Sequence, residues 1–418
     1  MSHSERVIII GGGIIGLLTA RELRRRGREV LVLDAGSGEG TASSGNAGII
    51  APGHFPIANP RQRSRALKLL FDPDSPLYIP PRFDLSMLRW LLGFRRACLP
   101  RNYRNTVEVL NHLSRISAEG WQELMNVDSP SDLAASLRPE GSLEVFCDES
   151  SREEAQHDAR LLHEDGFEAE LIDGDELRNR DDAFRDEVIG ALVHPGHIIT
   201  EPDRLLTALR THVIESGVVV RRDTTVQQIL ADRTACHGVV AGDDEVIEGE
   251  TVVLSAGIWS DGLARQHRIR VPMQPAKGYH LMVQSDHPPR LACVCRESMV
   301  AVNAMKDGVR LAGTLELSGI NHRLVRRRLE LLVQGAARCI DGLEEAPVLQ
   351  RWTGMRPCTA DGLPVIGPMP GLSGTWVATG HGMMGITLGP VTALLLGQMM
   401  HGEPTAMDTV PMSTGRFN

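Results

Sequence analysis

The sequence predicts an α/β fold with two domains: a Rossmann-type nucleotide-binding domain around a parallel sheet, and an α+β domain with helices and a mixed or antiparallel sheet. Three observations lead to this prediction. The 418 residues exceed the length at which a single hydrophobic core stops growing. A strand, a glycine turn and a helix begin the chain. Short segments of β type, "GSLEVF", "GALVHPG", "GYHLMV" and "VRLAG", share the middle of the chain with amphipathic helical segments.

The first element in order is a dinucleotide-binding turn. Residues 7–10 are an apolar run typical of a buried parallel strand, and three glycines follow it in the spacing G-x-G-x-x-G. The first glycine permits a tight turn, the second lets the main chain approach a pyrophosphate, and the third allows close helix packing. The helix that follows offers free N–H groups to the phosphates. The residues assigned to this site are Gly11, Gly13, Ile14, Ile15 and Gly16.

A second apolar strand, at residues 30–33, ends at Asp34 and is followed by Ala35. Asp34 lies about 20 residues after the turn, where an acidic side chain accepts hydrogen bonds from a ribose hydroxyl. We assign both residues to the nucleotide. No arginine follows Asp34, which disfavours a 2′-phosphate and therefore NADP. The pattern by itself does not separate FAD from NAD.

Later motifs extend this pattern along the chain: "TASSGNAGIIAPG", "RDTTVQQI", "ETVVLSAGIWSDGL", "RWTGMRPCTADGLPVIGP" and "WVATGHGMMGITLGP". With these motifs in view, the chain resembles the FAD-dependent D-amino acid oxidase and glycine oxidase superfamily, and most of all the bacterial D-amino acid dehydrogenases of small-subunit type. The resemblance runs from about residue 6 to the last helix. Its end motifs are specific in combination, whereas the middle of the chain is only loosely similar.

The resemblance implies FAD as the cofactor. In the family the loop at residues 43–48 lies along the isoalloxazine, and the final glycine turn points at the flavin N1–C2=O region, where negative charge gathers on reduction. Gly354 stands where sarcosine oxidases carry the cysteine that holds their flavin, so the resemblance implies non-covalent binding. The further residues assigned to FAD are Ser43, Ser44, Asn46, Ala47, Gly48, Val226, Ala256, Gly257, Gly354, Gly380, Gly382, Met383, Met384, Gly385 and Ile386.

Two residues are candidates for substrate contact. Arg356 in "GMRP" matches the arginine with which glycine- and D-amino acid-oxidising relatives hold the substrate carboxylate. A planar guanidinium can bind a carboxylate through two parallel hydrogen bonds, although a structural ion pair to Asp361 is the alternative. Tyr279, in an alternating strand, is the second candidate. Met383 stands where glycine oxidases carry another arginine, a departure that favours a larger and more apolar substrate side chain.

The implied reaction is oxidative deamination of D-amino acids to 2-oxo acids and ammonia, with hydride transfer from Cα to flavin N5. The neutral amine drives the hydride out, so no protein base is required. Electrons would pass to a quinone or another acceptor. Two alternatives keep the same chemistry: a cyclic imino acid substrate, such as D-proline or a hydroxy-D-proline, and an oxygen-using oxidase. A non-catalytic flavin-binding protein and an NAD-dependent dehydrogenase are the alternatives of other classes.

The motifs predict a discontinuous FAD-binding domain at residues 1–53, 200–264 and 350–418, with the substrate domain at 54–199 and 265–349. The net charge of −9 argues against nucleic acid as a partner. Seven scattered cysteines without a CxxC pair indicate reduced thiols in a cytoplasmic protein. No apolar run approaches the ~20 residues that span a bilayer.

One amphipathic helix leaves peripheral membrane contact open. In "SMLRWLLGFRR" the apolar residues form a stripe with arginines nearby, a pattern found in helices that bind a membrane surface. We favour packing against the substrate domain over membrane attachment, because most such stripes face a core. The residues of the stripe are Met87, Leu88, Leu91 and Leu92, and the basic residues are Arg89, Arg95 and Arg96.

Overall fold

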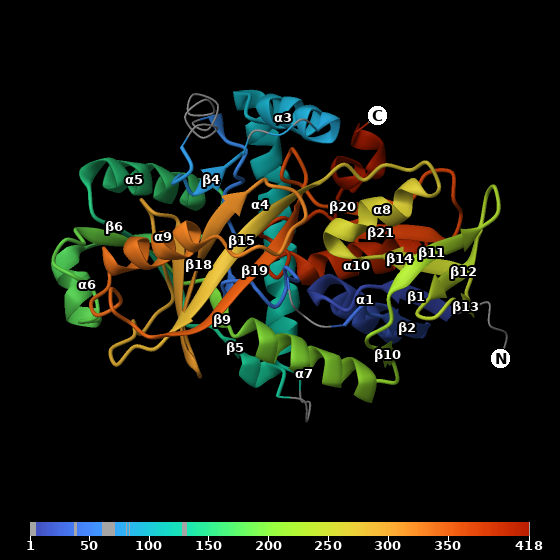
Figure 1. The fold of residues 1–418 in the computed structure, drawn as a ribbon, viewed down its shortest axis with the longest axis horizontal. Coiled ribbons are helices and arrows are strands. Elements are labelled where there is room, and N and C mark those ends of the chain that lie inside the picture. Colours follow the sequence, from blue (N-terminus) through green and yellow to red (C-terminus); the bar gives the residue numbers. More distant parts are fainter. Residues whose placement is uncertain are drawn as a thin grey trace.

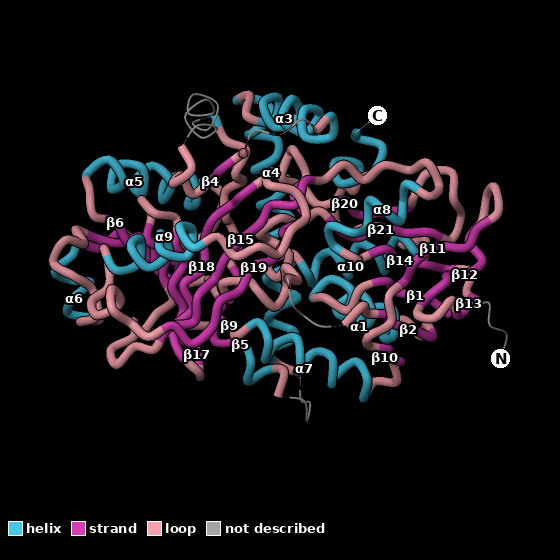
Figure 2. The backbone as a smooth tube through the Cα atoms, viewed as in Figure 1, coloured by secondary structure: helices cyan, strands magenta, loops and turns pink. Residues whose placement is uncertain are grey.

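The computed structural model describes residues 6–36, 40–60, 72–80, 82, 84–127 and 132–417. Figure 1 shows two strand systems side by side, one near both chain termini and one built on long antiparallel strands. Helices surround both systems, and loops fill the region where the two meet (Figure 2). This arrangement agrees with the predicted combination of an α/β and an α+β part.

A six-stranded sheet forms the nucleotide-binding part. Its order is β10-β2-β1-β14-β21-β20, and every neighbouring pair except β20 and β21 runs parallel. The strands come from three separate stretches of chain, while the domain limits themselves stay a prediction. The bounds are β1 (Arg6–Ile10), β2 (Glu29–Leu33), β10 (Val219–Arg221), β14 (Thr251–Leu254), β20 (Val365–Pro368) and β21 (Thr375–Thr379).

Successive side chains of β1 point to opposite faces of this sheet, and both faces are buried. Val7 and Ile9 pack with the helices α1 (Ile14–Arg25), α7 (Pro202–Glu215) and α10 (Gly389–Met400). Ile8 and Ile10 pack with a small antiparallel sheet on the opposite face. The apolar run therefore has the composition that a parallel strand covered on two sides requires. The small sheet consists of β11 (Val226–Ala231), β12 (Cys236–Ala241) and β13 (Glu245–Glu248).

The second part is a nine-stranded mixed sheet. Its order is β19-β15-β18-β17-β16-β6-β8-β7, with β4 pairing to β18. All four segments predicted as strands lie in this one sheet, and the pairs β16–β6 and β18–β4 are parallel. The strands are β4 (Leu77–Tyr78), β6 (Ser142–Phe146), β7 (Glu170–Asp173), β8 (Gly190–His194), β15 (Gln274–Val283), β16 (Cys293–Cys295), β17 (Val300–Met305), β18 (Gly308–Glu316) and β19 (Val348–Cys358).

Further helices join the two parts. The long α4 (Pro100–Met125) crosses the molecule between the two strand systems (Figure 1) and contacts α10. Ser117 and Trp121 of α4 donate hydrogen bonds to the Thr387 carbonyl, just before α10 begins. A short sheet, β3-β9-β5, links the loop after β2 to the second part. The remaining bounds are α3 (Leu85–Ala97), α5 (Glu149–Glu164), α6 (Gly174–Arg180), α8 (Ser260–Arg265), α9 (Arg326–Ala337), β3 (Ile49–Ile50), β5 (Leu137–Arg138) and β9 (Ile198–Thr200).

Candidate functional site

The N-terminal glycine turn leaves no room for larger side chains. A Cβ on Gly16 would lie 1.9 Å from the Gly11 carbonyl oxygen, and one on Gly11 would lie 2.5 Å from the Ser255 carbonyl oxygen. Gly11 also has a φ of +108°, which side chains rarely allow. Ser43 accepts a hydrogen bond from the Ile14 N–H at 3.1 Å, and the first turn of α1 carries no acidic residue. The start of α1 therefore fits the phosphates of a dinucleotide.

Asp34 lies against this turn. Its Oδ2 accepts a hydrogen bond from the Gly12 N–H at 2.5 Å, and its Oδ1 accepts one from the Gly36 N–H at 3.0 Å. The Thr224 N–H binds the Asp34 carbonyl oxygen at 2.8 Å, which brings the start of β11, and thus Val226, close to the nucleotide end of the site. The Asp34 side chain is partly exposed, so it can still meet a ribose hydroxyl.

The loop at residues 43–48 is anchored by two buried polar side chains of the second part. Arg310 on β18 donates hydrogen bonds to the carbonyl oxygens of Ser44, at 3.0 Å, and Asn46, at 2.8 Å. Asn303 on β17 donates to the Ala47 carbonyl oxygen at 2.9 Å. Sequence reasoning missed both anchors. Arg310 could have been identified from the sequence, because it is an arginine within the predicted strand segment "VRLAG", and it is buried.

Strand ends and the final glycine turn close the opposite side of the site. The Thr379 hydroxyl donates to the Gly257 carbonyl oxygen at 2.9 Å, so the ends of β14 and β21 lie together, and Ala256 lies at the same strand end. The Gly382 N–H binds the Pro357 carbonyl oxygen at 2.9 Å. The final turn, with Gly380 and Gly382 at positive φ, therefore docks on the strand that carries Arg356. Gly385 completes the turn, while Met384 and Ile386 are buried in the core with Ile14 and Ile15.

The paired strands β15 and β19 place Arg356 on one face of their ladder. Ala276 lies opposite Arg356, Gly278 opposite Gly354, and His280 opposite Trp352, so alternate residues of both strands share this face. A Cβ on Gly278 would lie 2.1 Å from the Arg356 Nη1, which shows that the guanidinium crosses over this glycine.

The Arg356 guanidinium has no carboxylate within ion-pair distance among the described residues. Its Nη1 donates to the Thr314 carbonyl oxygen at 2.9 Å. Asp361, the predicted structural alternative, pairs with Arg416 at 2.8 Å instead. Burial lowers the pKa of Arg356, and the nearby Cys358 thiol offsets this only in part. A partly buried cation without an acidic partner fits an anionic ligand.

Tyr279 lies on the opposite face of the ladder, and this geometry argues against the prediction that it contacts the substrate. Its hydroxyl donates to the Glu316 Oε2 at 2.9 Å, and its ring belongs to the core of the second part. Neighbouring Lys277 donates to the Asn321 Oδ1 at 2.6 Å on the same side. Periodicity predicts the alternation of side chains along this strand, but it does not tell which face points into the core.

The face that carries Arg356 holds His280 instead. The His280 ring stacks on Trp352 with 4.8 Å between centroids. Burial lowers the pKa of His280 to about 3, with smaller contributions from Arg310 and Arg356, so the imidazole is neutral at pH 7. A Cβ on Gly354 would lie 2.3 Å from the Trp352 ring, which fills the place where a flavin-linking cysteine would stand.

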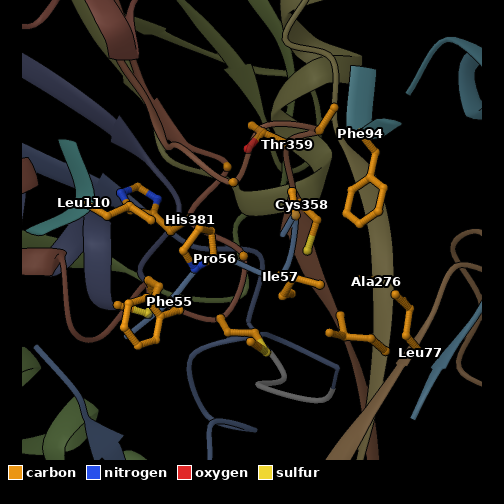
Figure 3. Close-up of a pocket in the computed structure, with 18 of the residues that line it drawn as sticks. Phe55, Pro56, Ile57, Leu77, Phe94, Leu110, Ala276, Cys358, Thr359 and His381 are labelled. Atoms are coloured by element: carbon orange, nitrogen blue, oxygen red, sulfur yellow. The ribbon is translucent and has the colours of Figure 1, made fainter. Parts of the chain in front are cut away.

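An apolar pocket (Figure 3) lies against the ladder face that also carries Arg356. Ala276 and Cys358, which share the ladder face of Arg356, line one side of it. Figure 3 shows His381 and Leu110 on the other side of the cavity from Phe94 and Leu77. Met383 and Met384 line the pocket as well. The aromatic lining residues that sequence reasoning did not identify are Phe55, Trp90 and Phe94.

Comparisons with known proteins agree with this geometry. The family described as FAD dependent oxidoreductase matches residues 6–399. D-amino acid dehydrogenases of Cereibacter sphaeroides and Rhizobium rhizogenes are 28% and 29% identical over 99% of this chain, covering 95% and 100% of the relatives. Glycine oxidase of Bacillus cereus is 20% identical with a TM-score of 0.71, and 96% of each chain is covered. L-proline dehydrogenase of P. horikoshii, 17% identical, has a TM-score of 0.75, covering 100% of this chain and 98% of that one.

The two solved structures share the fold of this chain. Among the described residues, no helix is both long and apolar enough to cross a membrane.

Proposed function

The chain belongs to the FAD-dependent oxidoreductase family, and from that premise we propose that it oxidises D-amino acids to 2-oxo acids and ammonia. The observation that carries this proposal is the Arg356 guanidinium, which has no acidic partner among the described residues and shares a ladder face with Ala276 and Cys358, two residues that line an apolar pocket. The curated relatives named D-amino acid dehydrogenase support the proposal. The preference for the D enantiomer rests on these relatives alone.

The residues present fit FAD. The glycine turn before α1 would hold the pyrophosphate, Asp34 the ribose, the loop at 43–48 the ring system, and the final glycine turn its polar edge. FAD, when bound, supplies the acceptor for a hydride from the substrate Cα. We propose non-covalent binding, because Gly354 offers no sulfur and Trp352 fills the adjacent space. Acid should then release the flavin from precipitated protein, and flavin that stays with the polypeptide would contradict this.

The side chains of the protein then have positioning roles. Arg356 would grip the substrate carboxylate through two hydrogen bonds and thereby fix the orientation of Cα. The pocket would take the substrate side chain and exclude water from it. The neutral His280 adds no second positive charge beside Arg356 at neutral pH. No described residue has to remove a proton from Cα, because the amine lone pair drives the hydride out. Water completes the reaction by hydrolysing the imine.

The lining of the pocket points to amino acids with apolar side chains. Three aromatic rings, those of Phe55, Trp90 and Phe94, face a cavity that also contains Leu315 and Leu317. Such a lining favours a branched or aromatic side chain, because each buried CH₂ contributes about 0.8 kcal/mol and a charged group would lose its hydration.

The decisive experiment is anaerobic bleaching of the yellow, FAD-loaded protein with a panel of D- and L-amino acids. The proposal expects bleaching by D-leucine, D-methionine or D-phenylalanine in preference to glycine and D-aspartate. Bleaching by L-amino acids only would refute the proposed handedness. A preference for D-proline over every open-chain compound would identify a cyclic imino acid as the substrate. Peroxide formation with the preferred substrate would identify an oxidase rather than a dehydrogenase.

We further propose that α3 contacts a membrane surface. A quinone within that membrane would then take the electrons from the reduced flavin. α3 lies at the edge of the molecule (Figure 1). Leu85, Leu88 and Leu92 are 74%, 55% and 59% exposed, whereas Met87 and Trp90 are buried, and Trp90 lines the pocket. The stripe predicted from the sequence is therefore divided between a packed side and an exposed side.

The exposed side of α3 joins apolar and basic residues. Its leucines are flanked by exposed arginines at 89, 95 and 96, which favour anionic lipid head groups. Flotation with anionic liposomes tests this proposal. The wild-type protein should float with the vesicles, and Leu88→Ser with Leu92→Ser should abolish flotation without loss of FAD. A wild-type protein that stays wholly in the aqueous fraction would contradict the proposal.

A further inference from the structure

Two cysteines and one glutamate, Cys147, Cys339 and Glu297, meet in the second part, although they are far apart in the sequence. Cys147 follows β6, Glu297 lies in the turn after β16, and Cys339 follows α9. The Sγ atoms of Cys147 and Cys339 are 3.7 Å apart. Ligand atoms of Cys147, Glu297 and Cys339 all lie within 4.8 Å of one another.

The spacing of the two thiols suits a shared metal ion. Zinc binds thiolates at ~2.3 Å in tetrahedral geometry, which places two of them about 3.8 Å apart. The observed 3.7 Å is close to that separation. A disulfide would require an S–S distance of ~2.0 Å. All seven cysteines are free thiols, so nothing competes for these two sulfurs.

The carboxylate is already held in place. The Glu297 Oε1 accepts a hydrogen bond from the Cys147 N–H at 2.7 Å, the kind of outer contact that orients a metal ligand. Cys147 and Glu297 are partly exposed, whereas Cys339 is buried. The group is therefore open to solvent on one side and closed on the other. This gives an ion an entry path.

The donor atoms of this group suit a thiophilic cation. They are two sulfurs and one carboxylate oxygen. The Arg338 guanidinium also lies near Cys147, so the local charge is mixed and the donor chemistry favours the ion. Thiolate-rich sites prefer soft or borderline metals over magnesium or calcium.

We propose that Cys147, Cys339 and Glu297 bind one thiophilic divalent cation, with Zn²⁺ as the representative ion and water from the open side as the remaining ligand. The site has a structural role, because it joins the ends of β6, β16 and α9. More than a hundred residues separate β6 from β16. It shares no residue with the apolar pocket that Ala276 and Cys358 line. The metal therefore takes no part in the proposed oxidation.

Metal analysis of the untagged, FAD-loaded protein tests this site. After treatment with a chelator under reducing conditions, the protein should take up one Zn²⁺ per chain, and its melting temperature should rise by about 4 °C. Co²⁺ should give the visible bands of a tetrahedral thiolate site at red wavelengths, where oxidised flavin does not absorb. The flavin spectrum should stay unchanged.

Variants of Cys147 and Glu297, the two partly exposed residues, show whether the ion binds at this site. Cys147→Ser combined with Glu297→Gln should abolish the cobalt bands and the thermal shift, while Cys236→Ala, a buried thiol outside the group, should keep both. The proposal is overturned if the wild-type protein gives no tetrahedral cobalt spectrum, or if the double variant and the control bind the ion equally. A Cys147–Cys339 disulfide, found by mass spectrometry in freshly purified protein, would also overturn it.

Discussion

The two faces of the β15–β19 ladder differ in how far their polar groups are satisfied. On one face Lys277 and Tyr279 have protein partners for their polar atoms, including Glu316 and Asn321. On the other face Arg356 reaches only a main-chain oxygen among the described residues. Both faces are covered by the fold, so burial alone does not distinguish them. The comparison teaches that a charge whose partner is missing from the protein indicates where a ligand binds.

The largest effect is expected from removing the guanidinium of Arg356. Arg356→Leu should lower kcat/KM at least ~100-fold, because a charge-assisted hydrogen bond contributes ~1.5–3 kcal/mol and each ~1.4 kcal/mol is tenfold. FAD should stay bound with a near-normal spectrum, and benzoate should no longer perturb it. Steady-state kinetics and flavin absorbance measure both effects.

Arg416→Leu is the matched control for that variant. This arginine pairs with Asp361, so its loss should reduce thermal stability while leaving KM unchanged. If Arg356→Leu instead loses its flavin or fails to fold, Arg356 has a structural role and the carboxylate assignment fails.

A smaller change on the same face, Gly278→Ala, displaces the Arg356 side chain without removing it. Gly278→Ala would place a Cβ 2.1 Å from the Arg356 Nη1 and force the guanidinium aside. We expect kcat/KM to fall about tenfold through a weaker substrate contact, with FAD retained. Gly196→Ala, where a Cβ would meet nothing within 4 Å, is the control and should change neither value. Equal kinetics of both variants would show that the position of the guanidinium does not matter.

His280 makes the ligand-facing side sensitive to acid. Its pKa in the folded protein is about 3, below the ordinary 6.5, so the unfolded chain binds the additional proton as the pH falls. Stability is therefore complete above the ordinary pKa and decreases as the pH falls towards 3. At about pH 5 the loss should be ~1–2 kcal/mol. His280→Phe should reduce the difference in unfolding free energy between about pH 7.5 and pH 5.

Denaturant titrations at the two pH values measure this difference. His112→Gln, at an exposed histidine, is the control and should behave like the wild type. An unchanged pH dependence in His280→Phe would mean that the imidazole is hydrated and titrates normally.

The smallest effect is expected on the satisfied face. Tyr279→Phe removes the hydrogen bond to Glu316, which should cost ~1–2 kcal/mol of stability and leave kcat/KM within about twofold. Chemical denaturation and steady-state kinetics measure the two values. A large rise in KM at unchanged stability would restore Tyr279 as a substrate contact and reverse the comparison of the two faces.

Elements whose requirements are local could be predicted from the sequence. The turn at Gly11 and Gly16 needs glycine because neighbouring main-chain atoms lie within 2.5 Å of any added Cβ, and that constraint is visible as a spacing of glycines. The helix α3 and the strands β6, β8, β15 and β18 were likewise predicted from their periodicity. Arg356 was identified through its resemblance to a family motif. The motif alone did not show that Asp361 forms its ion pair with Arg416.

What depends on contacts between distant segments was decided only by the tertiary structure. Strand alternation indicated that Tyr279 and His280 point in opposite directions, but only the packing of β15 shows that Tyr279 points into the core of the second part. The anchoring of the 43–48 loop by Arg310 and Asn303, and the meeting of Cys147 with Cys339, join segments more than a hundred residues apart. A local sequence pattern records steric needs of neighbouring residues, whereas these contacts depend on strand register and on how the two sheets pack.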